Sequence, residues 1–323
     1  MTNYLTSITS AASGATGIAT ELVQAVWDLV VGEALRELPT SRVIVDKRPE
    51  RPMSKGSSVT MEKYEWFSKA AVAAMLTPLL EETDVDSVGA PTPTHVIVTP
   101  AEYGAAVTRT RKLDNRTFAP VDPYLARLVA DAMNRTIDGL VQAAIIADTT
   151  PVWVGGGSTV NDVIGTDVLT ALELMKAVTR LRTNKAIPWF GNFYGGLVHP
   201  HVILDLRTAS GAGNWRVPNE YGASQDRIWA GEIGAFEGIR FIENALVNVA
   251  DNTAGTPNGV YQSYIFGRGA VAENVIVEPS VVIGPQVDKL RRFHTVGWYG
   301  DLGFKVYEPK AIERLASGSS MDS

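Results

Sequence analysis

Two histidines have the residue type and spacing that come nearest to a chemical site in this sequence. His199 and His201 are separated by one proline, and in an extended segment residues i and i+2 share a face, so their imidazoles could hold a metal ion. A third ligand is not evident, because Asp205 would need a particular turn to reach them. Isolated histidine pairs are usually structural or surface residues, and the sequence favours that interpretation. His95 and His294 are interpreted as ordinary strand residues.

Three other segments match chemical motifs only in part. Residues 154–159 have the sequence VGGGST, but the lysine of a phosphate-binding loop is absent, which indicates a flexible connector. The acidic cluster of residues 81–86 lacks the spacing of a calcium loop and indicates a solvated or interface-facing surface. Ser210 and Ser224 have no nucleophile elbow and no evident base. No catalytic, cofactor-binding or metal-ligating residues are therefore predicted, and the chain is not expected to be an enzyme.

The composition excludes several further classes of protein. The 323 residues carry a formal charge of −6 and include no cysteine. The mild negative charge argues against a dedicated nucleic-acid binder, and the absence of cysteine excludes disulfides and thiol nucleophiles. No lysine or arginine precedes Arg36, so the start of the chain lacks the positive region of a signal peptide. No apolar run approaches the length of a membrane span, and no membrane partner is expected.

One long amphipathic helix is expected to form the spine of a domain. Asp122 is its expected N-cap, Pro123 its first helical residue, and residue 147 its approximate end. At roughly 1.5 Å per residue it would span about 38 Å. Its apolar stripe is Leu125, Leu128, Val129, Ala132, Ile137, Leu140, Val141, Ala144 and Ile145. The residues expected on the opposite, polar face are Arg127, Asp131, Arg135 and Asp138.

The remaining elements are expected on either side of this helix. Residues 1–20 indicate a flexible arm, residues 20–38 a helix, and residues 105–112 a short strand. A second helix is expected from about 167 to 182, with Leu174, Val178 and Leu181 buried. Residues 188–285 indicate an α/β subdomain with strands at 196–198, 233–242 and 262–266. A strand over 293–307, a short helix over 309–315 and a disordered tail over 317–323 are expected to follow.

Residues 41–107 are predicted to form an extended arm with no core of its own. Prolines and glycines punctuate it, and strand-like alternation occurs around residues 59–62 and 95–99. If its halves pair with legs of roughly 20 residues, the arm reaches about 65 Å, farther than the body's radius of gyration of about 17 Å. A monomer could not cover its apolar residues, which are Tyr64, Trp66, Phe67, Met75, Leu76, Leu79 and Leu80. The arm is therefore expected to be buried on another chain.

Two basic groups accompany the arm and the spine helix. The first is Arg42, Lys47, Arg48, Arg51 and Lys55, and the second is Arg109, Arg111, Lys112 and Arg116. They form either a solvated face or contacts with carboxylates of neighbouring subunits, such as the acidic cluster, and contacts with backbone phosphate are less favoured. The predicted inter-subunit contacts are Arg48, Arg51, Lys55, Tyr64, Trp66, Phe67, Glu81, Glu82 and Asp84.

The order of these parts resembles the HK97-fold major capsid proteins of tailed bacteriophages. Residues 76–82 (LTPLLEE) and 96–104 (VIVTPAEYG) are similar to the return of the E-loop in that family. Residues 197–200 (LVHP) with Asp205 and Leu206 resemble the start of the family's axial domain. Residues 231–244 and 264–270 resemble a glycine-punctuated strand pair and the segment after it. Together these motifs cover most of residues 20–316.

This resemblance implies an α+β, HK97-like capsid fold with an N-arm, an extended E-loop hairpin, a long spine helix in a peripheral domain, and an α/β axial domain. The implied divisions are an N-terminal arm and helix (1–40), the E-loop arm (41–107), the peripheral domain (108–185), the axial domain (186–290), and a C-terminal strand and helix completing the peripheral domain (291–323).

The implied function is that of a major capsid protein. Pentamers and hexamers of the chain would form the icosahedral head around phage double-stranded DNA, which is contacted non-specifically. Implied partners are other copies of the chain, a separate scaffolding protein, a portal and, as a further candidate, a decoration protein. The implied location is the virion capsid, assembled in the cytoplasm of the host bacterium.

Two alternatives remain open at this point. A cellular nanocompartment shell with the same fold (an encapsulin-like protein) would enclose a cargo protein instead of DNA. A soluble α/β enzyme would use His199, His201 and Asp205 around a metal ion. Fold analogy alone does not decide function, and the contents of purified particles would separate the first alternative from a phage capsid.

Overall fold

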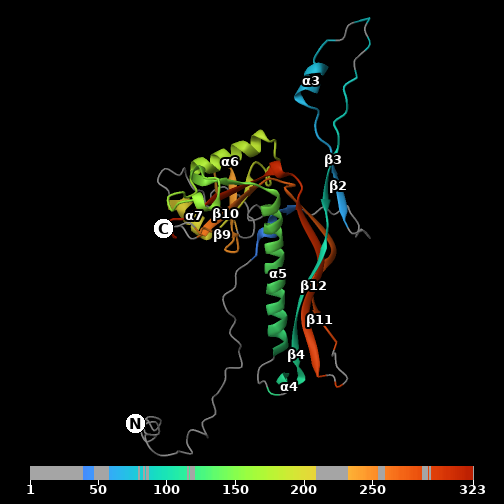
Figure 1. The fold of residues 1–323 in the computed structure, drawn as a ribbon, viewed down its shortest axis with the longest axis vertical. Helices are drawn as coiled ribbons and strands as arrows, with labels where there is room; N and C mark the ends of the chain where they lie inside the picture. The colour runs from blue at the N-terminus through green and yellow to red at the C-terminus, as the bar shows by residue number, and fades with distance from the viewer. Residues whose placement is uncertain are drawn as a thin grey trace, which may run out of the picture.

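The computed structural model describes residues 39–46, 58–78, 81–82, 84, 87–114, 116, 121–208, 232–253, 259–285, 290 and 292–322. The arm and helix predicted over residues 1–38 lie outside these residues, as do Arg48, Arg51, Lys55, Leu79, Leu80, Ser210 and Ser224. The described chain forms a body with two main sheets and one long helix, from which a thin arm projects along the longest axis (Figure 1). This mixed arrangement of helices and strands confirms the predicted α+β fold class.

A seven-stranded mixed sheet organises one part of the body. Its order is β5-β13-β10-β6-β8-β7, and β9 pairs with β10. The strands are β5 (Pro151–Trp153), β6 (Tyr194–Val198), β7 (Glu232–Phe236), β8 (Ile239–Glu243), β9 (Val249–Asp251), β10 (Gly259–Phe266) and β13 (Ile312–Ser317). Every residue of β6 is buried. Gly195 in this strand leaves room for a neighbour, because a Cβ there would lie 2.4 Å from the ring of Phe266.

Two helices cover this sheet with apolar residues. They are α6 (Ala171–Thr183) and α7 (Pro200–Thr208). Leu174, Val178 and Leu181 of α6 are buried, as predicted, and they share one core with Phe241 of β8. Helix α6 begins at residue 171, because Asp167 instead accepts a hydrogen bond from the backbone N–H of Ile164 in the preceding turn.

A four-stranded sheet supports the long helix. Its order is β1-β11-β12-β4, formed by β1 (Val45–Asp46), β4 (Ala101–Thr110), β11 (Val271–Ile283) and β12 (Phe293–Val306). Helix α5 (Val121–Asp148) lies along one face of this sheet (Figure 1), with Val129 packed against Val296 and Trp298 of β12. Helix α5 begins two residues before the predicted first helical residue, Pro123, and ends one residue beyond the predicted end at residue 147.

The faces of α5 differ in part from the prediction. Ile137, Val141 and Ile145 are buried as expected, whereas Leu128 is exposed. Asp138, predicted on the polar face, is also buried. Its carboxylate accepts hydrogen bonds from the backbone N–H of Ser41 at 2.7 Å and from Gln142 Nε2 at 2.8 Å. The helix therefore carries a buried polar stripe where the N-terminal segment crosses it, a contact that sequence periodicity does not reveal.

The buried polar network around Asp138 joins three parts of the chain. Gln142 Nε2 also donates to Ser41 Oγ at 2.9 Å and to the carbonyl oxygen of Leu246 at 2.9 Å. Asn244, at the end of β8, donates to Ser41 Oγ at 3.2 Å. Because Ser41, Asp138, Gln142 and Asn244 are all buried, these side chains depend on one another for their hydrogen bonds.

The closing segment of the chain differs from its prediction. A 3₁₀ turn, η5 (Pro309–Ala311), is followed by β13 where a helix was expected. β13 pairs antiparallel with β10 from Tyr261↔Ser317 to Phe266↔Ile312, so sheet pairing overrides the local helical pattern. The tail predicted to be disordered is described to residue 322, with Ser317 and Ser319 fully buried.

Sheet membership also crosses the predicted domain limits. The predicted axial range of 186–290 includes β11, which pairs with β12 and β1 in the four-stranded sheet. The predicted C-terminal completion of the peripheral domain includes β13, which lies in the seven-stranded sheet. The domain division itself remains a prediction.

The remaining elements are short. They are η1 (Ser41–Ile44), β2 (Val59–Lys63), α3 (Lys69–Met75), β3 (Thr94–Val98), α4 (Arg111–Asp114), η2 (Val154–Gly156) and η3 (Val160–Asp162). Within the described ranges, no helix has the length and apolar character needed to cross a membrane.

Candidate functional site

The projecting arm begins at a root where the hairpin β2–β3 packs on the body. Val59, Met61 and Val98 are at most 6 % exposed, and they form a cluster with Ala272 of β11 and the ring of Tyr307. Burying a large apolar side chain stabilises a fold by about 1.5–3 kcal/mol. The cluster therefore holds the root of the arm against the four-stranded sheet.

Polar contacts also join the root to the segment that follows β12. The hydroxyl of Tyr307 donates a hydrogen bond to the carbonyl oxygen of Glu62, 3.2 Å away. The ammonium of Lys63 forms an ion pair with Glu308. These contacts lie at the end of the hairpin farther from Val59, so they fix the direction in which the arm leaves the body.

The predicted arm is shorter and less regular than its sequence suggested. Residues 41–46 belong to the body, where Ser41 and Ile44 are fully buried and β1 pairs in parallel with β11. Residues 101–107 belong to β4, which pairs with β12. The paired legs of the arm are five residues each, from Val59↔Val98 to Lys63↔Thr94, instead of roughly 20. The part that projects beyond the root lies between residues 63 and 94.

Beyond its root, none of the arm residues that the structure describes is buried. Trp66 is 91 % exposed, Tyr64 is 74 % exposed and Phe67 is 45 % exposed. Helix α3 has no buried residue, although Ser68 caps it by accepting a hydrogen bond from the backbone N–H of Ala71 at 3.1 Å. Isolated helices shorter than about 12–15 residues are marginal in water. An exposed helix of seven residues flanked by aromatic side chains therefore suits a surface that packs on a partner.

The predicted contact residues lie at three kinds of place. Tyr64, Trp66 and Phe67 lie on the exposed arm, and Glu81, Glu82 and Asp84 are exposed farther along it. Arg48, Arg51 and Lys55 lie outside the described residues. A role for these residues in contacts between subunits remains a prediction.

Arg42 belongs to the basic group interpreted either as a solvated face or as contacts with neighbouring subunits, and it pairs within its own chain. Its guanidinium lies 2.6 Å from a carboxylate oxygen of Glu273 and 3.1 Å from one of Glu278, both on β11. Burial alone would lower the pKa of Arg42, but hydrogen bonds and attraction from Glu273 and Glu278 raise it above its usual value. Arg42 thereby fastens the N-terminal segment to the four-stranded sheet.

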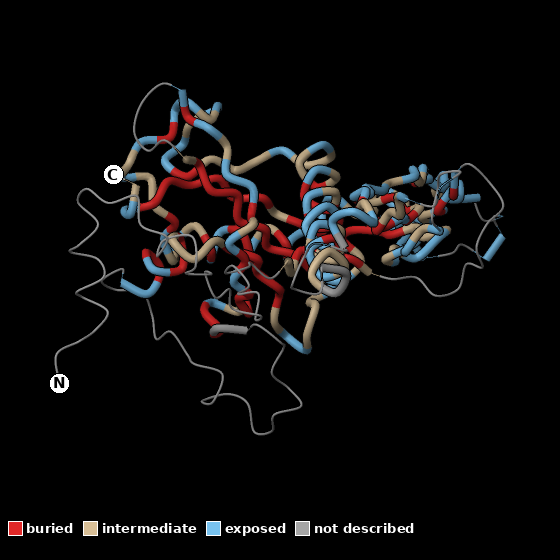
Figure 2. The backbone as a smooth tube through the Cα atoms, turned by 90° about the horizontal axis from the view of Figure 1, so that it is seen from below, coloured by how far each residue is buried: buried red, intermediate tan, exposed pale blue. Residues whose placement is uncertain are grey.

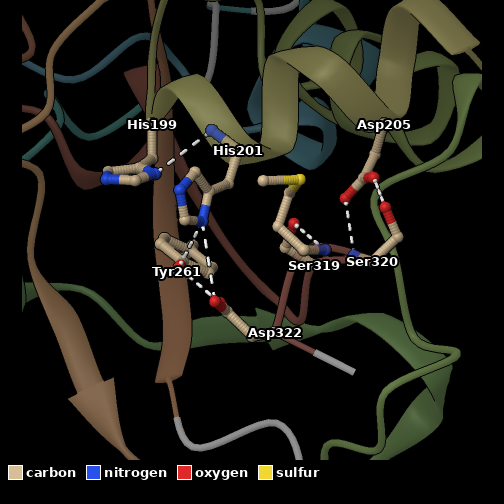
Figure 3. Close-up of polar contacts among 8 residues, drawn as sticks. His199, His201, Asp205, Tyr261, Ser319, Ser320 and Asp322 are labelled. Carbon is tan, nitrogen blue, oxygen red and sulfur yellow. Dashed lines mark hydrogen bonds and ion pairs between the residues drawn. The ribbon is translucent and has the colours of Figure 1, made fainter.

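The histidine pair lies at the start of α7, not in an extended segment. The rings of His199 and His201 are 4.7 Å apart in an edge-to-face arrangement, and His199 Nδ1 accepts a hydrogen bond from the backbone N–H of His201. Desolvation, and secondarily the neighbouring His201, lowers the pKa of His199 to about 4. His201 Nδ1 lies 2.8 Å from the hydroxyl of Tyr261 (Figure 3).

The C-terminal segment closes over this pair. The hydroxyl of Tyr261 donates a hydrogen bond to Asp322, whose second oxygen is 3.7 Å from His201 Nδ1. Burial and the Asp322 carboxylate together raise the pKa of Tyr261. Asp205, the third metal ligand considered above, instead accepts hydrogen bonds from the backbone N–H and the hydroxyl of Ser320 (Figure 3).

These contacts join α7 and β10 to the C-terminal segment. No group of three or more potential metal ligands occurs among the described residues. Sequence analysis missed Tyr261, Ser320 and Asp322, because more than 50 residues separate the tail from both Tyr261 and α7. His95 and His294 lie in β3 and β12, as predicted.

The glycine run around η2 is a connector, and the two backbone N–H groups that follow it are bound to a carboxylate. Gly155 and Gly156 both have φ near 85°, a conformation that favours glycine. The carboxylate of Asp162 accepts hydrogen bonds from the backbone N–H groups of Ser158 and Thr159, each at 2.8 Å. These hydrogen bonds lower the pKa of Asp162. This arrangement agrees with the predicted connector and differs from a phosphate-binding loop.

Comparison with known proteins identifies the family of this architecture. The profile of the phage capsid protein family matches residues 96–315, whereas no curated protein matches the sequence. The capsid of Ralstonia phage GP4 is 13 % identical with a TM-score of 0.70, covering 95 % of this chain and 98 % of that one. The Cyanophage Pam1 capsid is 13 % identical with a TM-score of 0.69, covering 95 % and 100 %. A chain of Mycobacterium phage Che8 is 19 % identical with a TM-score of 0.63, covering 91 % and 97 %.

Proposed function

The chain belongs to the phage capsid protein family, as a major capsid protein of the icosahedral head, and from this premise we propose that its copies hold one another through the projecting arm. The observation that carries the proposal is the contrast within the arm itself. Its root is buried and braced on the body, whereas its outer part exposes aromatic side chains and a helix without a core. Removal of that apolar surface from water on a neighbouring subunit supplies free energy for assembly, at roughly 25 cal/mol per Å².

A contact of this kind joins two different surfaces of the same chain. Such heterologous contacts close into rings when the rotation between neighbours permits, which suits assembly into pentamers and hexamers. A scaffolding protein and a portal complete the proposed set of assembly partners, with a decoration protein as a further candidate, and assembly takes place in the host cytoplasm. Packaged DNA is contacted without sequence preference, and the chain acts without catalysis.

An arm truncation tests this proposal while preserving the root. Lys63 and Thr94 are the last paired residues of the hairpin, so residues 64–93 can be replaced by Asn-Gly, which favours a tight two-residue turn. The buried cluster of Val59, Met61 and Val98 is retained in this variant. The truncated chain should be soluble and folded by circular dichroism but should form no closed shells.

Electron microscopy of the full and truncated chains, each with and without the scaffolding protein, provides the measurement. Closed shells from the full chain alone, with only unassembled subunits from the truncated one, would support the arm's role. Closed shells from the truncated chain would refute it. A matched control replaces Leu172 with serine, because that side chain is exposed on α6, away from the arm.

A further inference from the structure

We propose that the pocket between the root of the arm and the body binds an extended acidic peptide segment of a partner protein. Carboxylates along one edge of the peptide meet three cationic side chains on the body. Apolar side chains along its other edge meet aromatic rings at the start of the arm. Because the cationic wall lies on the body, the site does not require the arm to hold neighbouring copies together.

The pocket lies where the arm meets three segments of the body. It has a volume of about 640 Å³, within the range of about 300–1,000 Å³ that is typical of ligand sites. The body segments are the turn that ends α6, the turn between β10 and β11, and η5. The backbone N–H of Arg268 donates to the carbonyl oxygen of Ile187 at 2.9 Å, and that of Gly267 donates to Ala311 at 2.8 Å. These hydrogen bonds fix the body wall of the pocket before any ligand arrives.

Three cationic side chains on this wall lack a partner within the chain. Lys185, Arg268 and Lys310 line the pocket and are exposed. None of their side chains forms a hydrogen bond or an ion pair with any residue that the structure describes. They come from the three body segments joined by the backbone hydrogen bonds, so their charges converge on one wall. An anionic ligand can therefore bind there without breaking an existing ion pair.

The carboxylates that line the pocket do not balance these cations. Glu308 already pairs with Lys63, and Glu65 lies on the arm. Asp46 of β1 is then the remaining carboxylate on the body wall among the described residues of the lining. The body wall presents three positive charges against this one, although the whole chain has a formal charge of −6. Attraction for an acidic peptide is thus a property of this wall and not of the chain as a whole.

Lys185 occupies a backbone position that favours glycine. Its φ of 60° lies in the left-handed region, where a side chain strains the backbone. The residue follows α6, and its N–H donates to the carbonyl oxygen of Arg182 at 3.0 Å. The N–H of Ala186 donates to Leu181 at 2.9 Å, which completes a helix ending in which glycine is the usual residue. Strained residues of this kind gather at functional sites, and here the strained residue carries one of the three cations.

The arm supplies the apolar wall of the pocket. Tyr64 and Trp66 line it with exposed rings, and Ile187 adds an exposed apolar side chain to the lining. Side chains of an extended peptide alternate between its two edges. A segment in which acidic and apolar residues alternate can therefore contact both walls at once, whereas a free phosphate ion would leave the aromatic wall unused.

A labelled model peptide tests the site on unassembled full-length subunits. The probe is a fluorescein-labelled hexapeptide in which aspartate and leucine alternate, and its fluorescence anisotropy should rise to saturation as the subunit concentration increases. Exchange of its leucines for serine, or of its aspartates for lysine, should weaken binding roughly tenfold or more. Equal binding of the three peptides, or no saturable binding of the probe, would overturn the proposal.

Lys185→Gly separates ligand binding from folding. Loss of the ammonium should weaken binding of the probe roughly threefold, the effect of one exposed ion pair. Relief of backbone strain should leave the urea midpoint of the subunit unchanged or raise it. The matched control is Glu237→Gly in the exposed turn between β7 and β8, where φ is 49°, and this variant should bind the probe like the parent chain. A lower midpoint for Lys185→Gly together with unchanged binding would contradict the assignment of this residue to the site.

Replacement of all three cations should abolish most of the binding. The chain with Lys185→Gly, Arg268→Gln and Lys310→Gln should bind the probe roughly tenfold more weakly or worse, with an unchanged circular dichroism spectrum. Lys112→Gln removes an exposed cation of α4, outside the pocket, and should bind like the parent chain. Parental affinity in the triple variant would refute the site. That result would leave the proposed role of the arm intact, because the latter fails only if chains without residues 64–93 still close into shells.

Discussion

The part of the body built on the seven-stranded sheet and the projecting arm achieve stability in opposite ways. The seven-stranded sheet and its two helices share a core in which Phe241, Leu174 and Ile265 are fully buried. The arm beyond its root has no buried residue in α3 and exposes Trp66 almost completely. Figure 2 shows buried residues gathered in the part of the body that holds the seven-stranded sheet.

This difference shows that the same sequence must meet two requirements, one from folding and one from assembly. Core residues are constrained by folding of the single chain, whereas arm residues are constrained by what the chain meets after folding. A substitution in the core should therefore change subunit stability first and assembly only as a consequence. A substitution in the arm should change assembly alone.

Phe241→Ala should produce the largest effect, because it removes a fully buried ring from the core beside the seven-stranded sheet. Removing a buried phenylalanine costs about 3–5 kcal/mol, a large share of the 5–15 kcal/mol that stabilises a typical domain. Urea unfolding of unassembled subunits should show a lower free energy of unfolding. The yield of soluble protein should fall as well. An unchanged unfolding midpoint would show that this core does not determine subunit stability.

Trp66→Ala should leave the unassembled subunit almost unchanged and still impair shell formation. Exposed substitutions change folding stability by within about 0.5 kcal/mol, and the ring is 91 % exposed. Its burial at a subunit contact would be worth about 1.5–3 kcal/mol, so the subunit concentration needed for assembly should rise roughly tenfold or more. Light scattering across a concentration series measures this threshold. Equal threshold concentrations for the variant and the parent chain would show that Trp66 is not part of the subunit interface.

Local signals in the sequence were enough to predict α5 and the unpartnered arm. The helix has a capping pattern and many turns of regular apolar spacing, so its bounds did not depend on distant contacts. The arm was detectable because its apolar residues lie among prolines and glycines with no periodic partner. The length of the arm's paired legs could not be predicted from local signals. The root is defined by packing on Ala272 and Tyr307, which lie far along the chain.

Elements defined by distant pairing were missed or misassigned. β11 contains Pro279, which argues against a long strand. The structure accommodates it through irregular pairing with β12 between Val275 and Ser280. Residues 312–317 have spacing that suits a helix or a strand, and β10 decides the outcome by pairing with them. The contact between Asp322 and Tyr261 was likewise beyond any local pattern.

Asp138→Asn sharpens the comparison at the junction where the long helix meets the N-terminal segment and the end of β8. The native carboxylate accepts hydrogen bonds from both the Ser41 N–H and Gln142 Nε2, whereas an amide would place a donor against one of these donors. An unsatisfied buried polar group costs about 1–3 kcal/mol, so the urea midpoint of unassembled subunits should fall. Asp251→Asn, at an exposed position on β9, is a matched control that should change the midpoint little. Equal midpoints for the two variants would mean that the buried network contributes nothing to stability.

His199→Gln should have the smallest effect, confined to acidic solution. The pKa of His199 is about 4 in the folded chain against 6.5 as its usual value, so between these values the unfolded chain binds more protons. The stability contributed by neutral His199 is thus present above about pH 6.5 and is lost as the pH falls toward 4. Because the ring is only half-buried, solvent screening reduces this contribution to about 1 kcal/mol. Urea midpoints of unassembled subunits should decline less between about pH 7 and pH 4 in the variant than in the parent chain. The matched control is His95→Gln, on the exposed part of β3, whose urea midpoint should decline as much as that of the parent chain. If the midpoint of His199→Gln also declines as much as that of the parent chain, protonation of other groups governs acid sensitivity.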